Sequence, residues 1–410
     1  MKLSGPFSQV VTMSVIPLKG KVKDEQLQVL ENAGILTENG EILKVGKYSD
    51  LKTEFPNAEW DEVEGKKVAL PGFIDSHTHI CFGGKRSKDF AMRLDGKTYL
   101  EIAESGGGIL STVTNTRKET EQDLVKSTLE KANHLFSNGI TTLEIKSGYA
   151  LNVEGELKML RAINDVKSQI QADVFPTFLG AHMKPRDFDG TNSEYLELLV
   201  HVVLPVIQSE NLAKRVDIFT EQSAFTVDES RVYLQKVKEK GFEITIHADQ
   251  FTPGGSRLAV EVGAVSADHL EFSGEEEIKL LANSDVVAVA LPGASIGLGM
   301  QYTPARKLLD AGACLSIASD WNPGSAPMGD LLTQASILAT FEKLSMAEVL
   351  SGLTFRAAKA LNLTDRGSLE IGKKADFISF PTDDFRDIIY YQGQLKADGV
   401  WKNGNRIHFK

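Results

Sequence analysis

Short apolar runs alternate with longer stretches of helical character from about Val68 onward. Eight of these runs have the pattern of strands: residues 68–75, 140–146, 173–180, 216–220, 243–247, 264–269, 285–291 and 314–319. Helix candidates lie between them, among them residues 119–138 and 155–169. Strands that alternate with helices are typical of βα units and a parallel sheet. Eight units over roughly 300 residues predict an α/β protein with a TIM (β/α)8 barrel, and a doubly wound sheet is the alternative.

The two ends of the chain have a different pattern. Residues 33–46 and 399–409 each have the pattern of two short strands joined at an Asn-Gly pair, which favours a type I′ hairpin. Residues 367–380 also resemble a strand pair. The two ends are therefore expected to meet in one small β-rich unit.

This pattern divides the chain into two domains. Residues 1–66 and 369–410 are expected to form a composite β-sandwich domain, and residues 67–368 the TIM-barrel domain. The 410 residues leave room for this division, and 42% apolar residues are ample for a buried core.

Charge and cysteine content narrow the class of partner. A formal charge of −11 argues against nucleic acid or an anionic membrane, so we expect a small molecule, and an anionic one would need a local Arg or Lys. Two cysteines far apart in sequence give no disulfide framework, and no secretion signal is evident, which favours a cytoplasmic protein. The most apolar stretch, residues 196–207, is short for a membrane span and is expected to be a buried helix.

Side chains that can bind a metal gather at the predicted strand ends. In "DSHTH" the residues His77 and His79 lie two apart, so on a strand they would point to the same face. Other strands end near His182, His247, His269 and Asp320. Since the active site of a TIM barrel lies at the carboxyl ends of its strands, these residues are expected to share one face.

Three imidazoles and one carboxylate suit a borderline divalent ion such as Zn(II) or Fe(II). We expect this ligand set to be His77, His79, His247 and Asp320, spread along the chain as in a catalytic centre rather than a structural finger. A bound metal can lower the pKa of water from about 15.7 to about 7. Asp320 would also accept the proton of the attacking water; its alternative is a helix cap or turn residue.

Further residues near these strand ends are candidates for substrate contacts. His182 would polarise a carbonyl, and His269 would orient the water; for both, a structural role in a polar network is the alternative. Arg86 is a natural anchor for a substrate carboxylate, unless it is a solvated surface residue. Tyr99 and Tyr149 can add hydroxyl donors, although core packing explains most tyrosines.

Several sequence blocks resemble a known family. They are "HTHICFGGKR" (77–86), "GGGILSTVTNTR" (106–117), "EIKSGYAL" (144–151), "FLGAHMKP" (178–185), "HADQ" (247–250), "SADHLE" (266–271) and "DWNPGSAP" (320–327). Together they are similar to the imidazolonepropionases, a family of the metal-dependent amidohydrolase superfamily. "ADF" at residues 375–377 and the β-rich ends resemble the composite β-domain of that superfamily.

The resemblance implies hydrolysis of 4-imidazolone-5-propanoate to N-formimidoyl-L-glutamate, the third step of histidine degradation. It implies one Zn(2+) or Fe(2+/3+) per subunit on the four ligands above, and a homodimer. Carried onto this chain, the substrate-binding residues would be Arg86, Tyr99, Tyr149, His182, Gln250, Asn322, Gly324 and Ser325. Asp320, His269, His182 and Gln250 would be the catalytic residues.

Two other functions remain open. The first is an aminohydrolase, or deaminase, of a cyclic amidine or nucleobase; Gln250 weakens it, since deaminases on this scaffold carry a proton-shuttling Glu there. The second is a non-catalytic assembly protein that kept the barrel, which the intact ligands disfavour. Lys146 raises a separate question, because binuclear relatives bridge two metals with a carboxylated lysine; we expect one metal and a structural or charged pocket role for Lys146.

Overall fold

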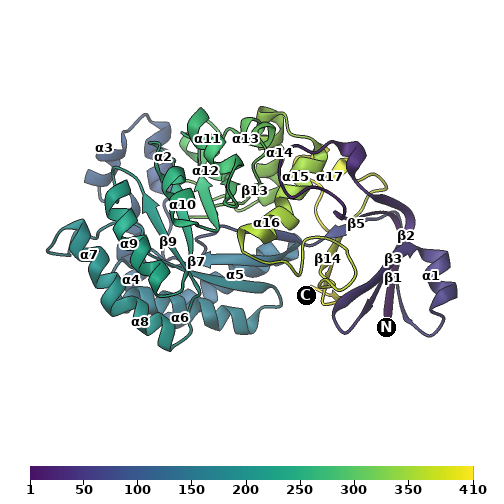
Figure 1. Cartoon of the computed structure of the whole chain (residues 1–410). Helices are drawn as coiled ribbons and strands as arrows, with labels where there is room; N and C mark the ends of the chain where they lie inside the picture. Colours follow the sequence, from purple (N-terminus) through teal and green to yellow (C-terminus); the bar gives the residue numbers. More distant parts are fainter. Residues whose placement is uncertain (410) are drawn as a thin grey trace.

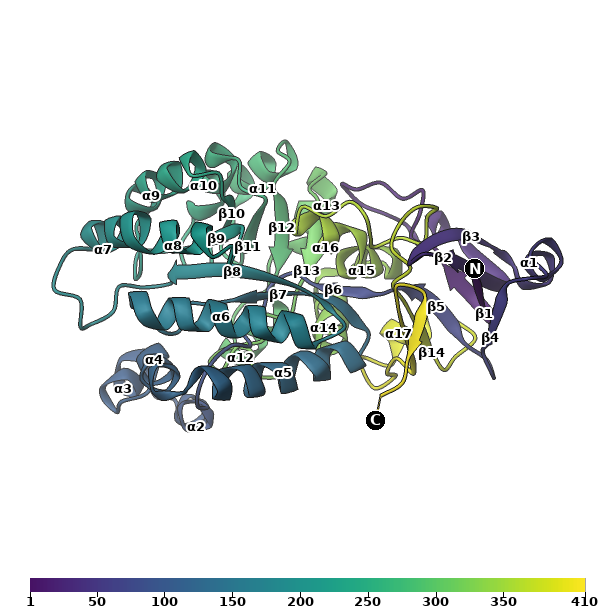
Figure 2. The ribbon, with the colours of Figure 1, turned by 90° about the horizontal axis from the view of Figure 1, so that it is seen from below.

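A computed structural model of the chain describes residues 1–409, apart from the side chains of Tyr99, Leu100 and Ala103. Figures 1 and 2 show two parts, a barrel of strands wrapped by helices and a separate sheet that contains segments from both ends of the chain. Both termini lie at the terminal sheet (Figure 1).

The barrel consists of eight parallel strands that neighbour one another in chain order. They are β6 (Phe73–Asp75), β7 (Ile140–Lys146), β8 (Asp173–Ala181), β9 (Arg215–Thr220), β10 (Glu243–Ala248), β11 (Ser266–His269), β12 (Val287–Ala290) and β13 (Leu315–Ile317). A doubly wound sheet would reverse its strand order near the middle, and this sheet does not. The predicted TIM barrel is therefore confirmed and the doubly wound alternative is wrong.

The barrel closes just beyond the ends of its first and last strands. Thr78 forms a parallel bridge with Trp321, and the His79 amide donates to the Trp321 carbonyl at 2.9 Å. The Asp320 amide donates to the His77 carbonyl at 3.0 Å. The seam of the barrel is thus held by the backbone of the segments that carry three expected metal ligands.

Helices cover the outside of the barrel (Figure 2). They are α2 (Ser87–Leu94), α3 (Tyr99–Glu104), α4 (Ile109–Lys118), α5 (Glu121–Ser137), α6 (Val153–Gln169), α7 (Asn192–Leu198), α8 (Leu204–Ser209), α9 (Val227–Glu239), α10 (Gly255–Val262), α11 (Glu275–Ala282), α12 (Pro292–Leu298), α13 (Ala305–Ala311), α14 (Leu331–Glu342), α15 (Met346–Leu353) and α16 (Phe355–Ala360).

The two helices predicted from residues 119–138 and 155–169 are confirmed as α5 and α6. Each begins at a side-chain cap, because Thr120 accepts the amide of Asp123 and Asn152 that of Gly155. Residues 196–207, expected to form one buried helix, span α7, a π-helical turn (Leu199–Val203) and α8. None of the described helices is long and apolar enough to cross a membrane.

The terminal sheet contains β1 (Lys2–Val11), β2 (Val29–Glu38), β3 (Glu41–Lys47), β4 (Glu59–Glu62), β5 (Val68–Pro71), β14 (Phe377–Phe380), β15 (Gly399–Lys402) and β16 (Asn405–Ile407). Its strand order is β16-β15-β14-β5-β1-β2-β3, and β4 pairs with the first half of β1. A short 3-10 turn (Asp24–Gln26), α1 (Tyr48–Glu54) and α17 (Asp387–Tyr390) complete the described elements of the terminal segments.

Both predicted Asn-Gly hairpins are confirmed. Asn39 and Gly40 join β2 to β3 with φ of 53° and 85°, and Asn403 and Gly404 join β15 to β16 with φ of 49° and 75°. Positive φ at both central positions is what a type I′ turn requires. A small aromatic core of Phe7, Phe377 and Trp401 packs within the sheet, with the Phe377 and Trp401 rings stacked at 4.7 Å.

Two strand predictions need correction. Residues 68–75, expected to be one barrel strand, split at Gly72: β5 pairs with β14 and β1 in the terminal sheet, and β6 starts the barrel. Residues 367–380, expected to be a strand pair, contain the single strand β14. The division of the chain into domains at residues 66 and 369 stays a prediction, and the hydrogen bonding places the change of sheet at Gly72.

A cluster of charges joins the two parts. Asp173, the first residue of β8, accepts bonds from Arg366 Nη1 at 2.5 Å, Lys374 Nζ at 2.8 Å and Lys402 Nζ at 3.1 Å, all on Oδ2. Lys402 belongs to β15, so this carboxylate links the barrel directly to the terminal sheet.

Candidate metal centre and substrate cavity

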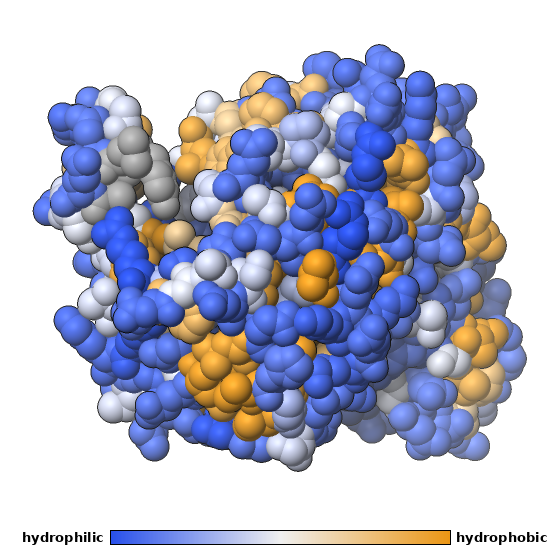
Figure 3. Space-filling view, turned by 60° about the vertical axis from the view of Figure 1, so that its left-hand side comes forward, coloured by the Kyte–Doolittle hydropathy of each residue, from blue (hydrophilic) through white to orange (hydrophobic). Residues whose placement is uncertain are grey.

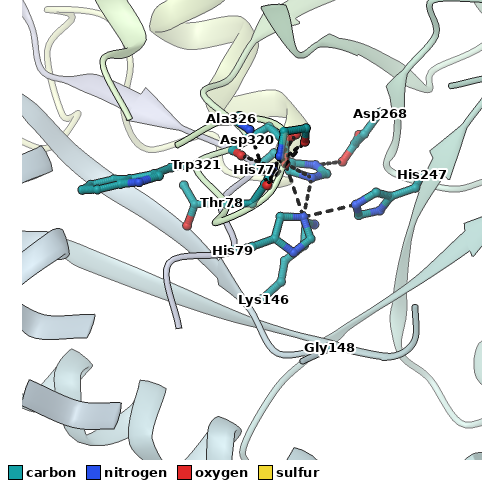
Figure 4. Close-up of polar contacts among 12 residues, drawn as sticks. His77, Thr78, His79, Lys146, Gly148, His247, Asp268, Asp320, Trp321 and Ala326 are labelled. Atoms are coloured by element: carbon teal, nitrogen blue, oxygen red, sulfur yellow. Dashed lines mark hydrogen bonds and ion pairs between the residues drawn. The ribbon is translucent and has the colours of Figure 1, made fainter. Parts of the chain in front are cut away.

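The sequence-predicted residues come together at the carboxyl ends of the barrel strands. His77 and His79 follow β6, His247 lies near the end of β10, and Asp320 follows β13. Figure 4 shows the three imidazole rings turned toward one another, with Asp320 beside them. All four side chains are buried.

Three imidazole nitrogens converge on one point, and the Asp320 carboxylate lies beside two of them. His79 Nε2 lies 3.1 Å from His77 Nε2 and 3.2 Å from His247 Nε2. Asp320 Oδ1 lies 3.4 Å from His79 Nε2 and 3.6 Å from His77 Nε2. Ligands about 2.0–2.1 Å from a tetrahedral metal lie about 3.3 Å from one another, so these separations fit a bound divalent ion.

Two of the imidazoles are oriented from behind by carboxylates. His77 Nδ1 lies 2.7 Å from Asp268 Oδ2, and His247 Nδ1 lies 2.9 Å from Asp217 Oδ2. A carboxylate at Nδ1 holds the ring proton there and leaves the Nε2 lone pair for a metal. Lone pairs that face one another in a buried site repel unless a cation lies between them, which is the second reason that these residues fit a metal.

The protonation of the rings agrees with this role. Burial lowers the pKa of His77 and of His79 well below the ordinary value, and neighbouring cationic groups lower it further. Burial also lowers the pKa of His247 to about 3, although Asp217 opposes the shift. The three rings are therefore neutral near pH 7, as metal ligands must be.

Asp320 and His269 face the centre from neighbouring positions. Burial raises the pKa of Asp320 to about 7, partly offset by His269 and by a bond from Asn322 Nδ2 at 3.0 Å. His269 Nδ1 lies 3.4 Å from Glu271 Oε1. Burial alone would lower the pKa of His269, but Glu271 outweighs it and the pKa is raised. Both residues have left-handed backbone, with φ of 51° and 88°, a kind of strain that is concentrated at functional sites.

Lys146 lies beneath the centre in an ion-pair network. Its Nζ lies 2.6 Å from Glu144 Oε1 and 2.9 Å from Asp217 Oδ2, and the three side chains are fully buried. Burial would lower the pKa of Lys146, but Asp217 and Glu144 outweigh it and raise the pKa. A charged, paired ammonium cannot be carboxylated, so this geometry favours the structural role expected for Lys146.

A cavity of about 660 Å³ opens onto the metal centre. His79, His247, His269 and Asp320 line its inner end, and the apolar side chains near its mouth include Phe251, Phe272, Leu298 and Met300. Figure 3 shows a notch in the surface at the upper left, on the side of the molecule where α2 and α3 lie. The cavity is large enough for a small organic substrate.

Most predicted substrate-binding residues line this cavity: Arg86, Tyr149, His182, Gln250, Asn322, Gly324 and Ser325. Arg86, at the start of α2, is held by Asp89, whose Oδ2 accepts the Arg86 Nε at 2.8 Å. That bond leaves the terminal nitrogens of the guanidinium for a ligand. The side chain of Tyr99 lies outside the described part of the chain, so its contact stays a prediction.

His182 presents an acceptor to the cavity. Its Nδ1 donates to the Gly148 carbonyl at 3.0 Å, and burial lowers the pKa of His182 to about 4. A neutral ring protonated at Nδ1 offers only a lone pair at Nε2. In this state His182 is suited to accept a substrate N–H, and it cannot polarise a carbonyl as the sequence suggested.

The segment after Asp320 forms a compact turn around Asn322. Asn322 Oδ1 accepts the amides of Gly324 and Ser325, both at 2.8 Å, and its Nδ2 donates to Ser325 Oγ at 3.0 Å. The turn fixes Gly324 and Ser325 on the cavity wall. The Asn322 side chain is therefore largely engaged within the turn.

Some residues of the site escaped the sequence analysis. Asp217 and Glu144 lie inside apolar strands, and Asp89 and Arg93 lie on a surface helix. A carboxylate within an otherwise apolar buried strand is a signal that could have identified the first two, because an unpaired buried charge is costly.

The fold and this site define the class of protein. The sequence profile described as "Amidohydrolase family" matches residues 68–407. Among solved structures, the atrazine chlorohydrolase of Arthrobacter aurescens complexed with zinc aligns with a TM-score of 0.73 at 18% identity, over 99% of this chain and 95% of the other. An adenosine deaminase from Xanthomonas campestris with bound zinc aligns with a TM-score of 0.71 at 17% identity, over 98% and 92%. The chain belongs to the amidohydrolase family.

Curated relatives narrow the family further. The imidazolonepropionase of Fusobacterium nucleatum is 41% identical over 392 residues, which cover 95% of this chain and 94% of the relative. That of Clostridium tetani is 36% identical over 406 residues, 98% of this chain and 97% of the relative. Within the amidohydrolases, the chain is a member of the imidazolonepropionase family.

Proposed function

We infer that this chain hydrolyses 4-imidazolone-5-propanoate to N-formimidoyl-L-glutamate by opening its cyclic amide. The identity of 36% and 41% to two curated imidazolonepropionases, over nearly the full length of the chain, carries this conclusion. The site supports it, because one cavity holds a fitting metal centre at its inner end and the Arg86 guanidinium on its wall. A substrate that has a cyclic amide and a carboxylate side chain matches this cavity, because the amide can face the metal centre and the carboxylate can face Arg86.

The metal is proposed to be Zn(2+) or Fe(2+/3+), one per subunit, bound by His77, His79, His247 and Asp320. When bound, it supplies Lewis acidity that makes a water molecule nucleophilic at neutral pH and polarises a carbonyl. Imidazole and carboxylate ligands suit both ions. Elemental analysis of the purified protein measures the identity and the stoichiometry of the metal.

The chain's own residues supply proton transfer. Asp320, whose pKa burial raises to about 7, is suited to accept a proton from the attacking water and to pass it to the leaving ring nitrogen. His269 faces the same region and is held by Glu271. The balance is that of hydrolysis: the carbonyl carbon gains the water oxygen, the C–N bond breaks, and the nitrogen takes the proton.

Other residues hold the substrate. Arg86 is proposed to bind the propionate, and His182 Nε2 to accept a ring N–H. Gln250, buried at the cavity wall, would hydrogen-bond the ring, and Tyr149 would donate from its hydroxyl, since burial and the nearby Asp320 raise its pKa. Gly324 and Ser325 offer backbone and hydroxyl groups near the product. Tyr99 and a homodimer are further proposals from the family, and light scattering of the purified protein tests the dimer.

The direct test follows the loss of imidazolone ultraviolet absorbance together with the appearance of formimidoylglutamate. Turnover should stop after chelation and return when zinc or iron is restored. Release of ammonia from a cyclic amidine or nucleobase would favour the aminohydrolase instead. No turnover by the metal-loaded protein would contradict the conclusion.

A further inference from the structure

A second guanidinium lies on the cavity wall next to Arg86 and has no role in the site described so far. Arg86 immediately precedes α2, and Arg93 lies in the last turn of that helix. Residues seven apart lie on the same face of a helix, two turns from each other. Both side chains line the cavity.

The two guanidiniums meet at one residue of the opposite wall. Arg93 Nη2 donates to the Gly324 carbonyl at 3.0 Å. A Cβ on Gly324 would collide with Arg86 Nη1, so the absence of a side chain there lets Arg86 lie against the backbone. Both guanidiniums therefore lie next to Gly324, at the same part of the cavity wall.

The local charges do not cancel. Asp89 pairs with Arg86, and the same oxygen also accepts the Gly108 amide at 2.8 Å. Among the described residues Arg93 has a hydrogen bond to the neutral Gly324 carbonyl and a contact with the Phe90 ring at 5.6 Å but no carboxylate of its own, and its buried Nε has no hydrogen-bond partner. Burial and the nearby Arg86 lower the pKa of Arg93, which Asp89 only partly offsets. Two partly desolvated cations that share one carboxylate leave a net positive charge for a ligand to neutralise.

We propose that Arg93 is a second carboxylate-binding residue, and that the propionate of the substrate is bound between Arg86 and Arg93. The proposal rests on the proposed function for the identity of the substrate. Arg93 would select for an anionic side chain on the ring without touching the reacting amide. Its removal should therefore raise KM and leave kcat nearly unchanged.

The test measures binding as well as turnover. The probes are 3-(imidazol-4-yl)propanoate and its uncharged primary amide, titrated against metal-loaded wild type, Arg93→Met and Arg93→Lys. Arg93→Met should weaken binding of the propanoate roughly 10- to 100-fold, the effect of one charge-assisted hydrogen bond, and change binding of the amide little. Arg93→Lys should restore part of the loss, because it returns the charge without the fork geometry.

Lys97→Met is the matched control. Lys97 also lines the cavity, but it is exposed and already paired with Glu101 at 2.9 Å, so the affinity for the propanoate should stay close to that of wild type. Equal loss of propanoate and amide binding in Arg93→Met would mean that Arg93 only supports the Gly324 turn, and unchanged propanoate binding would also overturn the proposal. The binding experiment does not depend on turnover. If wild type does not hydrolyse the imidazolone but Arg93→Met still loses affinity for the propanoate alone, the proposed reaction is refuted and the role of Arg93 in carboxylate binding is kept.

Discussion

The three imidazoles of the proposed metal centre differ in the contacts that their Nδ1 atoms make. His77 Nδ1 is hydrogen-bonded to Asp268, and His247 Nδ1 lies 2.9 Å from Asp217 Oδ2 without an aligned hydrogen bond. His79 Nδ1 has neither kind of contact among the described residues. A carboxylate behind an imidazole fixes its tautomer and raises its basicity as a ligand. The ligands of this centre therefore depend to different degrees on the residues around them.

Asp268→Asn should weaken metal binding while the protein stays folded. The amide keeps the size of the side chain but no longer favours a proton on His77 Nδ1, and such changes typically cost about 10- to 100-fold in metal affinity. Competition with a chromophoric chelator measures the change. Asp187→Asn, at a largely exposed carboxylate paired with Arg117, is the control and should leave metal affinity unchanged.

Asp320→Asn should nearly abolish turnover. The substitution removes a proposed metal ligand that is also the proposed proton acceptor, and the loss of general base catalysis alone costs roughly 10²- to 10⁴-fold. The rate should be measured with metal in excess, so that weaker loading does not account for the loss. Rates near wild type would show that Asp320 does not carry the proton.

The gathering of the proposed ligand residues at one end of the barrel could be predicted from the sequence, because their spacing and strand-end positions obey a rule of the barrel fold. The partners of the supporting residues could not. A carboxylate in an apolar strand indicates that Asp217 and Glu144 need a buried partner, but the sequence does not show that Lys146 pairs with both. The tautomer of His182 depends on the Gly148 carbonyl, 34 residues away, and so needed the structure.

Among the elements, helix α6 shapes the wall of the site through one side chain. Glu156 in its first turn is fully buried and accepts the amides of Gly148 at 2.9 Å and of Ala150 and Leu151 at 2.8 Å. These bonds fold the segment that follows β7, which carries Tyr149 and the carbonyl that holds His182. The helix thereby sets the position of two side chains in the cavity.

Glu156→Gln should loosen this segment. One amide oxygen cannot accept all three bonds, so we expect a loss of about 1–3 kcal/mol in the free energy of unfolding and a higher KM. Denaturant unfolding and steady-state kinetics measure the two effects. Glu154→Gln, two residues earlier on the same helix, should change neither.

The limits of strand prediction show at Gly72. The apolar run at residues 140–146 has the same bounds as β7, because Gly139 and the polar residues after Lys146 delimit it. The run at residues 68–75 does not match a single strand, because an apolar run does not reveal which sheet supplies its partners. The partner of β5 is β14, about 300 residues away, and a Cβ at Gly72 would collide with Thr141, so the chain changes sheets where it has no side chain.

At the scale of the whole molecule, Asp173 couples the barrel to the terminal sheet. Burial alone would raise its pKa, but Lys402, Lys374 and Arg366 outweigh burial and lower it. A carboxylate with a lowered folded pKa adds stability above its unfolded pKa of about 3.9, and this contribution is lost as the pH falls below that value.

Asp173→Asn should therefore lower the free energy of unfolding near pH 7 by roughly 1–3 kcal/mol. The difference from wild type should shrink as the pH falls below about 4, because the carboxyl of the unfolded chain is then protonated while the native carboxyl, with its lowered pKa, stays ionised. Thermal or denaturant unfolding across this range measures it. Asp383→Asn removes an exposed partner of Lys66 and should have no measurable effect, and a pH-independent difference at residue 173 would contradict the assignment.

The pairing of β5 between β1 and β14 also affects the protein while it is being synthesised. β1 to β5 leave the ribosome first, but the second edge of β5 stays unpaired until residues 377–380 have been made. At typical translation rates of about 5–20 residues per second, the 300 intervening residues take roughly 15–60 seconds. During that time a nascent chain exposes an apolar strand edge, so the N-terminal segment is where a chaperone is most needed and where premature termination would most readily produce aggregates.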